Sequence, residues 1–201
     1  ACGVITGIGA VTNTAKVKAG STVVVIGAGG VGLNAIQGAA IAGASKIIAI
    51  DVSEEKLNVA KEFGATAGIL TSDEKPYRIV KKMTGGRGVD YVFVTVGSIP
   101  AYESASRFLS VGGSVVMVGM PPSGAKVAIE PVILAMTSQS LLGSYMGSSV
   151  LKKDIPVLID LYRQGRLKLD ELVTRKYPLN KINEAVNDVK LGNTRRNVIV
   201  F

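Results

Sequence analysis

A glycine-rich loop at residues 27–32 is the first place in this sequence where residue types and spacing indicate chemistry. The loop reads Gly-Ala-Gly-Gly-Val-Gly and satisfies the pattern G-x-G-x-x-G. In this pattern Gly27 permits a tight turn, Gly29 lets the backbone approach a pyrophosphate, and Gly32 lets a helix pack on its strand. The N–H groups and positive dipole at the start of a following helix attract the same anion. The loop therefore predicts a dinucleotide site.

An acidic residue strengthens this interpretation. Asp51 lies 19 residues after Gly32, at the end of the second predicted strand. A carboxylate there can accept hydrogen bonds from both hydroxyls of a ribose, and it would repel a 2′-phosphate. NAD is therefore favoured over NADP. The alternative is a glycine turn and a surface aspartate with no ligand.

The elements that must position these residues follow an alternation of strands and helices. Strands are expected at 22–26, 46–50, 67–70, 89–96 and 114–119, and helices at 33–42, 54–63, 76–83 and 101–109. Short β-branched runs separated by helix-length segments are typical of βαβ units. The fold class predicted is α/β, a doubly wound parallel sheet with helices on both faces. Ser53 is a candidate N-cap of its helix, with Glu54 and Glu55 in the first turn.

The composition excludes several kinds of site. Cys2 is the only cysteine and there is no histidine, so a disulfide, a zinc finger or an imidazole-based triad cannot form within these residues. The net charge is +8, but aromatic residues make up only 5% and no nucleic-acid motif is present. No apolar run reaches the roughly 20 residues of a membrane span. We expect no nucleic-acid partner, no membrane partner and a cytoplasmic location.

The tail does not continue the alternation of strands and helices. Helices are expected at 150–164 and 181–191, the second with Asn180 as its candidate cap, and a strand at 197–201. The domain prediction is a nucleotide-binding domain at residues 1–146, opened by a helix at 1–18, and a separate C-terminal segment at residues 147–201.

The whole chain resembles the coenzyme-binding half of a zinc-dependent medium-chain alcohol dehydrogenase. The residues that carry the likeness are 2–7, 27–32, Asp51 with Lys56, 118–122 and 179–185. The resemblance implies a Rossmann domain whose tail packs on an N-terminal GroES-like catalytic domain, which these residues do not include. It also implies a homo-oligomer joined through an edge strand, for which residues 127–145 are the apolar candidate.

The family's functional positions carry over residue by residue. Cys2 matches a ligand of the catalytic zinc, and Thr6 and Val31 match positions against the nicotinamide. Lys56 matches a residue at the adenosine ribose, and Arg196 matches a tail arginine that reaches the pyrophosphate, a role that Arg195 could take instead. The remaining matches are the loop residue Gly30, the cleft residues Thr95 and Val96, and Val118, Ser144 and Met146, whose backbone groups face the carboxamide.

The resemblance implies NAD-dependent, zinc-assisted transfer of a hydride between an alcohol and an aldehyde or ketone. Residues 1–201 would bind NAD but be catalytically incomplete, because zinc and the substrate pocket belong to the complete enzyme. Two alternatives are a zinc-free quinone oxidoreductase, which Cys2 and Asp51 disfavour, and a non-catalytic nucleotide-sensing module. A methyltransferase using S-adenosylmethionine would not explain Cys2, residues 118–122 or the tail.

Overall fold

The structure is a computed structural model that describes residues 2–72, 75–192 and 194–201. The chain divides into two compact units, residues 1–151 and residues 152–201. The predicted domain boundary between residues 146 and 147 concerns which domain the tail belongs to, and it stays a prediction. Within the described residues, no helix is both long enough and apolar enough to cross a bilayer.

The first unit is built on a six-stranded sheet in which every pairing is parallel, with the order β3-β2-β1-β4-β5-β6. Because β1 lies between β2 and β4, the strand order reverses at the end of β1, and ligands of such sheets bind in the crevice at that point. The strands are β1 (Thr22–Ile26), β2 (Lys46–Asp51), β3 (Ala67–Leu70), β4 (Val89–Val94), β5 (Leu109–Met117) and β6 (Ser140–Gly143).

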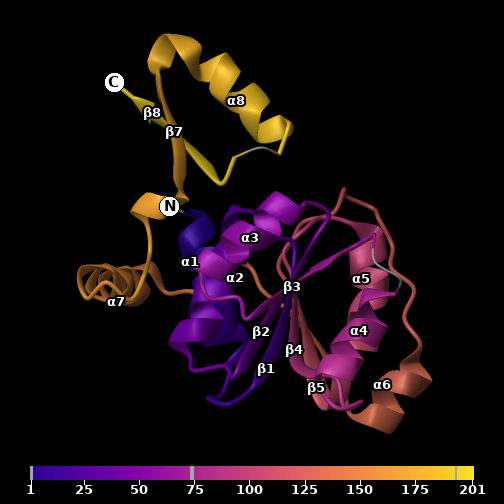
Figure 1. The fold of residues 1–201 in the computed structure, drawn as a ribbon. Helices are drawn as coiled ribbons and strands as arrows, with labels where there is room; N and C mark the ends of the chain where they lie inside the picture. Colours follow the sequence, from indigo (N-terminus) through magenta and orange to yellow (C-terminus); the bar gives the residue numbers. More distant parts are fainter. Residues whose placement is uncertain (1, 73–74, 193) are drawn as a thin grey trace. The chain divides into compact units, whose positions relative to one another are not determined.

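Helices cover both faces of this sheet, with α1 and α2 on one side and α4 and α5 on the other (Figure 1). The predicted doubly wound α/β fold is therefore confirmed. The helices of this unit are α1 (Cys2–Gly9), the π-helix η1 (Ala10–Ala15), α2 (Gly30–Ile41), α3 (Glu54–Glu62), α4 (Pro76–Met83), α5 (Ile99–Ala105), the 3-10 turn η2 (Ser106–Phe108), α6 (Pro131–Thr137) and the 3-10 turn η3 (Met146–Ser148).

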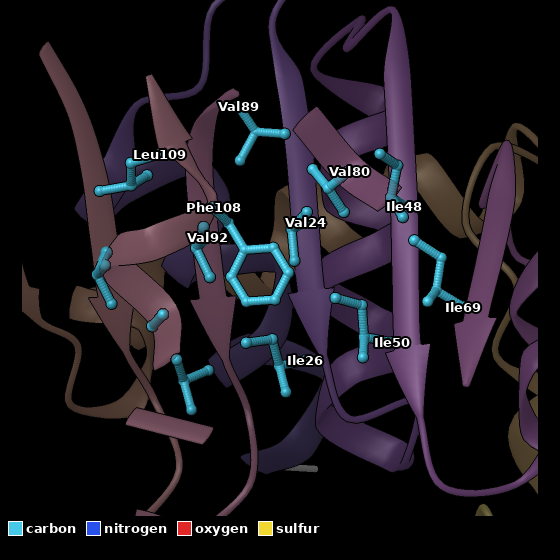
Figure 2. Packing of buried hydrophobic residues seen from close by; sticks show 13 residues of the cluster. Val24, Ile26, Ile48, Ile50, Ile69, Val80, Val89, Val92, Phe108 and Leu109 are labelled. Atoms are coloured by element: carbon cyan, nitrogen blue, oxygen red, sulfur yellow. The ribbon is translucent and has the colours of Figure 1, made fainter. Parts of the chain in front are cut away.

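One buried cluster joins the sheet to α4, α5 and η2. The ring of Phe108 lies beside Val24 and Val92, and Val80 of α4 packs into the same group (Figure 2). Strands buried on both faces read as continuous apolar runs, as β1 does: all five of its residues are buried. The core thus holds the strand ends in a fixed register beneath the loops that follow them.

The second unit pairs β7 (Val173–Pro178) with β8 (Arg196–Val200) in a parallel two-stranded sheet. It also contains α7 (Leu151–Arg163), which starts at the unit boundary, the 3-10 turns η4 (Asp170–Leu172) and η5 (Leu179–Lys181), and α8 (Ile182–Lys190). Large apolar side chains are exposed on both helices, among them Ile155, Val157, Ile182, Val186 and Val189. The strand β7 was not expected from the sequence.

Several element boundaries differ from the sequence-based expectations. The helix expected to begin at residue 33 begins at Gly30, so the last glycines of the loop form its first turn. The helix expected at 101–109 is α5 followed by η2, because Leu109 already opens β5. Asn180 is not the cap of α8: it lies inside η5, and Lys181 holds the cap position without a side-chain hydrogen bond. The leading helix ends at Ala15, where Lys16 adopts a left-handed conformation.

Candidate cofactor-binding site

Five of the predicted site residues sit at the carboxyl ends of neighbouring strands. Gly27 follows β1, Asp51 ends β2, Thr95 follows β4, Val118 follows β5 and Ser144 follows β6. Because the strands are parallel, their carboxyl ends meet at one edge of the sheet. The structure therefore gathers these residues along one edge of the sheet, where the ligand crevice of such folds is expected.

The glycine loop is folded as its sequence requires. Gly27 has a φ of +97°, and its N–H extends the β1–β2 ladder by donating to the carbonyl of Ile50 at 2.7 Å. A Cβ on residue 32 would overlap the carbonyl oxygen of Gly27 and lie 2.9 Å from Oγ1 of Thr95. Only glycine at position 32 lets the helix start this close to the strand end.

The first turn of α2 is open on the side of the crevice. Gly29 holds the N-cap position, and the first hydrogen bond of the helix runs from the N–H of Leu33 to the carbonyl of Gly29 at 2.8 Å. Helix geometry leaves the preceding N–H groups without a partner inside the helix. A Cβ on residue 29 would meet nothing within 4 Å. Gly30 and Val31, the next predicted contacts, form this first turn and are half-buried. The arrangement suits an anion such as a pyrophosphate.

Asp51 lies beside this loop and is only 7% exposed. Its Oδ2 accepts a hydrogen bond from the N–H of Ala28 at 2.7 Å, and its Oδ1 accepts one from the N–H of Ser53 at 3.1 Å. Ser53 caps α3 as expected, since its hydroxyl accepts from the N–H of Lys56 at 3.4 Å. Lys56 is half-buried in the first turn of α3.

The other end of the crevice is closed by α1 and η3. A Cβ on Gly7 would overlap the carbonyl of Val31, which places Thr6 and its neighbour next to the start of α2. A Cβ on Gly147 would lie 2.9 Å from the carbonyl of Thr6. The structure therefore brings Thr6, Val31 and the Met146–Gly147 turn together.

The turn before η3 is tied to the rest of the first unit through hydroxyl groups. The hydroxyl of Ser144 lies 2.8 Å from the hydroxyl of Thr14. The backbone N–H of Ser144 donates to the carbonyl of Met117 at 3.0 Å. Met146 itself is half-buried and has a φ of +50°. These bonds fix the backbone of the predicted carboxamide contacts.

The loops after β4 and β5 interlock between these two ends. The N–H of Val118 donates to the carbonyl of Val94 at 3.0 Å, and a Cβ on Gly119 would overlap the backbone of Val96. The hydroxyl of Tyr102 donates to the carbonyl of Gly119. Nothing in the sequence marks Tyr102, because its role depends on a backbone carbonyl of a neighbouring loop. Ala28 lies inside the predicted glycine loop, but no pattern indicates the bond from its N–H to the carboxylate of Asp51.

Cys2 opens α1 in the first unit, and Arg196 opens β8 in the second. Cys2 is exposed, and no group of three or more cysteine, aspartate or glutamate side chains suited to a metal occurs in the described part of the chain. One thiolate cannot fill the coordination sphere of zinc, so these residues do not by themselves fit the metal. Arg196 begins β8 in the second unit, where the N–H groups of Arg195 and Arg196 point at Oγ1 of Thr174. The predicted reach of Arg196 to the pyrophosphate stays a prediction.

A charged cluster lies at the opposite edge of the sheet. Asp90 accepts hydrogen bonds from the N–H of Thr22 at 2.7 Å and from the guanidinium of Arg87 at 2.9 Å. Burial by itself raises the pKa of Asp90, but the hydrogen bonds from Arg87 and Thr22 and the charge of Arg87 together lower that pKa below its usual value. This cluster binds the start of β1 to the start of β4, so its role is to stabilise the fold and not to bind a ligand.

Comparison with known proteins matches this geometry to one family. A family model described as zinc-binding dehydrogenase matches residues 30–164. The protein of Schizosaccharomyces pombe named probable S-(hydroxymethyl)glutathione dehydrogenase 1 is 42% identical over 200 residues, which are 98% of this chain and 52% of that protein.

Two solved structures extend the comparison. Benzyl alcohol dehydrogenase from Acinetobacter calcoaceticus superposes with a TM-score of 0.95 at 36% identity, over 98% of this chain and 54% of that one. A dehydrogenase of Sinorhizobium meliloti 1021, solved bound to NADP, superposes with a TM-score of 0.88 at 26% identity, over 100% of this chain and 58% of that one. The chain thus spans little more than half the length of these relatives, and the resemblance drawn from the sequence is confirmed.

Proposed function

This chain belongs to the family of zinc-binding dehydrogenases, and from that premise we propose that it is the NAD-binding portion of a zinc-dependent alcohol dehydrogenase. The enzyme would transfer a hydride between an alcohol and NAD. One observation carries the cofactor assignment: the buried carboxylate of Asp51 lies against the glycine loop at the point where the strand order reverses.

Each part of NAD has candidate partners along the crevice. The pyrophosphate would meet the open first turn of α2, where Gly29 leaves room for it. The adenosine ribose would lie at Asp51 and Lys56, and the nicotinamide between Thr6 and Val31. The backbone groups of Val118, Ser144 and Met146 would receive the carboxamide, with Thr95 and Val96 lining the cleft and Arg196 at the pyrophosphate.

The same carboxylate argues for NAD over NADP. A 2′-phosphate on the ribose would stand next to the negative charge of Asp51, and none of the ion pairs formed by residues 2–72, 75–192 and 194–201 includes this carboxylate. Like charges in such proximity cost several kcal/mol. The Sinorhizobium meliloti relative was solved with NADP, so the preference is a proposal for this chain alone.

Catalysis would require the remainder of the enzyme. When bound, zinc polarises the oxygen of an alcohol or aldehyde. Cys2 is the ligand that the family resemblance assigns, and the described residues hold no group of three ligating side chains. Two further protein ligands would therefore have to come from an N-terminal catalytic domain. What this chain contributes is the binding and orientation of the cofactor. We therefore propose that residues 1–201 alone bind NAD and turn over no alcohol.

Partners follow from the same assignment. The substrate would be a small alcohol or aldehyde, and the cell compartment the cytoplasm. The edge strand β6 has a free side, and α6 next to it exposes Val132, Ile133 and Met136. An open apolar edge is a template for pairing with a second copy, so we propose a homo-oligomer joined through β6.

Calorimetric titration of the 201-residue chain with NAD and, separately, with NADP tests the proposal. We expect saturable binding of NAD and binding of NADP at least about tenfold weaker. The variant Asp51→Ala should lose this preference. Asp90→Ala is the matched control, because Asp90 is also a carboxylate that receives a backbone N–H at 2.7 Å but lies away from the crevice.

Absence of binding for both cofactors would contradict the assignment of a preformed cofactor site. Equal affinity for the two cofactors would contradict the role given to Asp51. Turnover of alcohols by the isolated chain would contradict its catalytic incompleteness, and a separate assay that follows reduced nicotinamide by absorbance measures that turnover.

A further inference from the structure

The carboxylate of Asp51 accepts a hydrogen bond from the backbone of the glycine loop. Its Oδ2 lies 2.7 Å from the backbone nitrogen of Ala28, in a hydrogen bond that is buried from solvent. Ala28 is only 2% exposed and sits between Gly27 and Gly29, at the centre of the turn that starts the glycine loop. The carboxylate therefore reaches the loop itself as well as the place of the ribose.

The bonds around Ala28 make this contact decisive for the loop. Gly27 continues the β1–β2 ladder through its N–H, and Gly29 already caps α2. The N–H of Ala28 would be a buried donor without a partner if Asp51 were absent, and an unpaired buried donor is strongly unfavourable. The carboxylate thus acts as a hook that holds the turn between strand and helix.

We propose that Asp51 is a positioning residue for the glycine loop and that this role is separable from its charge. The inference rests on the proposed function, because it concerns a loop assigned to the pyrophosphate. An oxygen acceptor at this position holds Ala28, whereas the negative charge discriminates against a 2′-phosphate. A change of cofactor preference at residue 51 therefore requires a side chain that keeps the acceptor.

Two substitutions separate these properties. Asp51→Asn removes the charge and keeps one oxygen that can accept from Ala28, while its NH2 group takes the place of the oxygen that accepts from the N–H of Ser53. Asp51→Ala removes both the charge and the acceptor. Asp90→Ala is the control, since Asp90 makes an equivalent 2.7 Å bond to the N–H of Thr22 at the opposite end of β1.

The first measurement needs no cofactor. In the isotope-labelled full chain, hydrogen exchange of the Ala28 amide should be about tenfold faster or more in Asp51→Ala than in the wild type. It should stay within about threefold of the wild type in Asp51→Asn and in Asp90→Ala. The control should instead accelerate exchange at Thr22. An unchanged exchange rate at Ala28 in Asp51→Ala would overturn the proposal that Asp51 holds the loop. Equal acceleration in Asp51→Asn would overturn the proposal that this role is separable from the negative charge.

A second measurement uses the wild-type chain and keeps the proposal testable if Asp51→Ala does not fold. A scalar coupling across the hydrogen bond should join the amide nitrogen of Ala28 to the carboxyl carbon of Asp51. Observation of this coupling supports the hook. Its absence, in spectra that resolve such couplings for the β1–β2 ladder, would overturn it.

The third measurement brings in the cofactors by calorimetry. Asp51→Asn should retain an affinity for NAD within about tenfold of the wild type and should reduce the ratio of the NAD affinity to the NADP affinity. Asp51→Ala should lower the affinity for both cofactors by about tenfold or more. Strong binding of NADP by Asp51→Ala would overturn the proposal. If Ala28 responds as expected but the wild type binds neither cofactor, the proposed function fails and the hook stands.

Discussion

The hydroxyl of Thr95 lies 2.8 Å from the carbonyl oxygen of Gly27, which joins the end of β4 to the glycine loop. The same hydroxyl is 3.0 Å from the carbonyl oxygen of Ile26. Both carbonyls belong to the turn at the end of β1, so the hydroxyl holds that turn from the side of β4, whereas Asp51 of β2 contacts it from the other side. The residue matched to the cofactor cleft on sequence thus has a structural task inside it.

Two substitutions of Thr95 separate the effect of its hydroxyl from the effect of its methyl group. Thr95→Val removes the donor and should lower the free energy of unfolding by on the order of 1 kcal/mol, because Gly27 loses a hydrogen bond. Thr95→Ser keeps the hydroxyl and should retain the affinity for NAD, whereas the valine variant should bind NAD more weakly. Denaturant unfolding and calorimetry measure the two effects. Loss of affinity in Thr95→Ser without loss in Thr95→Val would show that the methyl group matters instead.

Gly32→Ala should destabilise the chain, because the new Cβ would overlap the carbonyl oxygen of Gly27. Overpacking of this kind costs about 1–3 kcal/mol, and it should be visible as a lower denaturation midpoint. Gly29→Ala is the matched comparison, since a Cβ there meets nothing within 4 Å. We expect that variant to keep its stability and to lose NAD affinity. The opposite pattern would argue against the assignment of the open first turn to a pyrophosphate.

The Asp90 cluster should make stability depend on pH in the acidic range. The pKa of Asp90 is lowered on folding, since the bonds from Arg87 and Thr22 outweigh the effect of burial. The unfolded chain therefore binds the proton first as pH falls, and the contribution of this carboxylate is complete above its unfolded pKa of about 3.9 and lost below it. Asp90→Asn should be less stable than the wild type at neutral pH by on the order of 1 kcal/mol. That difference should shrink toward pH 2 in urea unfolding; a difference independent of pH would contradict the assignment.

Tyr102→Phe should loosen the loop that follows β5. The hydroxyl of Tyr102 donates to the carbonyl of Gly119, and its loss should cost about 1 kcal/mol and weaken NAD binding. Tyr77→Phe is the control, because Tyr77 contacts Phe108 and Arg107 through its ring. If Tyr77→Phe lowers the affinity for NAD as much as Tyr102→Phe does, the result would contradict a role for the Tyr102 hydroxyl.

The sequence was sufficient for five of the six strands of the sheet and for its doubly wound class, because β1, β2 and β4 are marked by strong local patterns; β6 and the strand order come from the structure. It was less accurate where tertiary contacts decide. Leu109 belongs to β5 although the periodicity assigned it to a helix, since it pairs with Val89 across the sheet. The contact of Asp51 with Ala28 joins a side chain to a backbone group in another loop, and no residue pattern encodes such a bond.

The two ends of β1 are held by hydrogen bonds that differ in the sequence separation of their partners. The bond between Ala28 and Asp51 spans 23 residues, whereas that between Thr22 and Asp90 spans 68. Closing a longer stretch of chain costs more entropy, so we expect the adenosine side of the crevice to assemble within the first βαβ unit, before β4 docks. In refolding kinetics, Asp51→Ala should slow folding, and Asp90→Ala should chiefly speed unfolding. A chain emerging from the ribosome would then have its nucleotide loop in place while half of its sheet was still unmade.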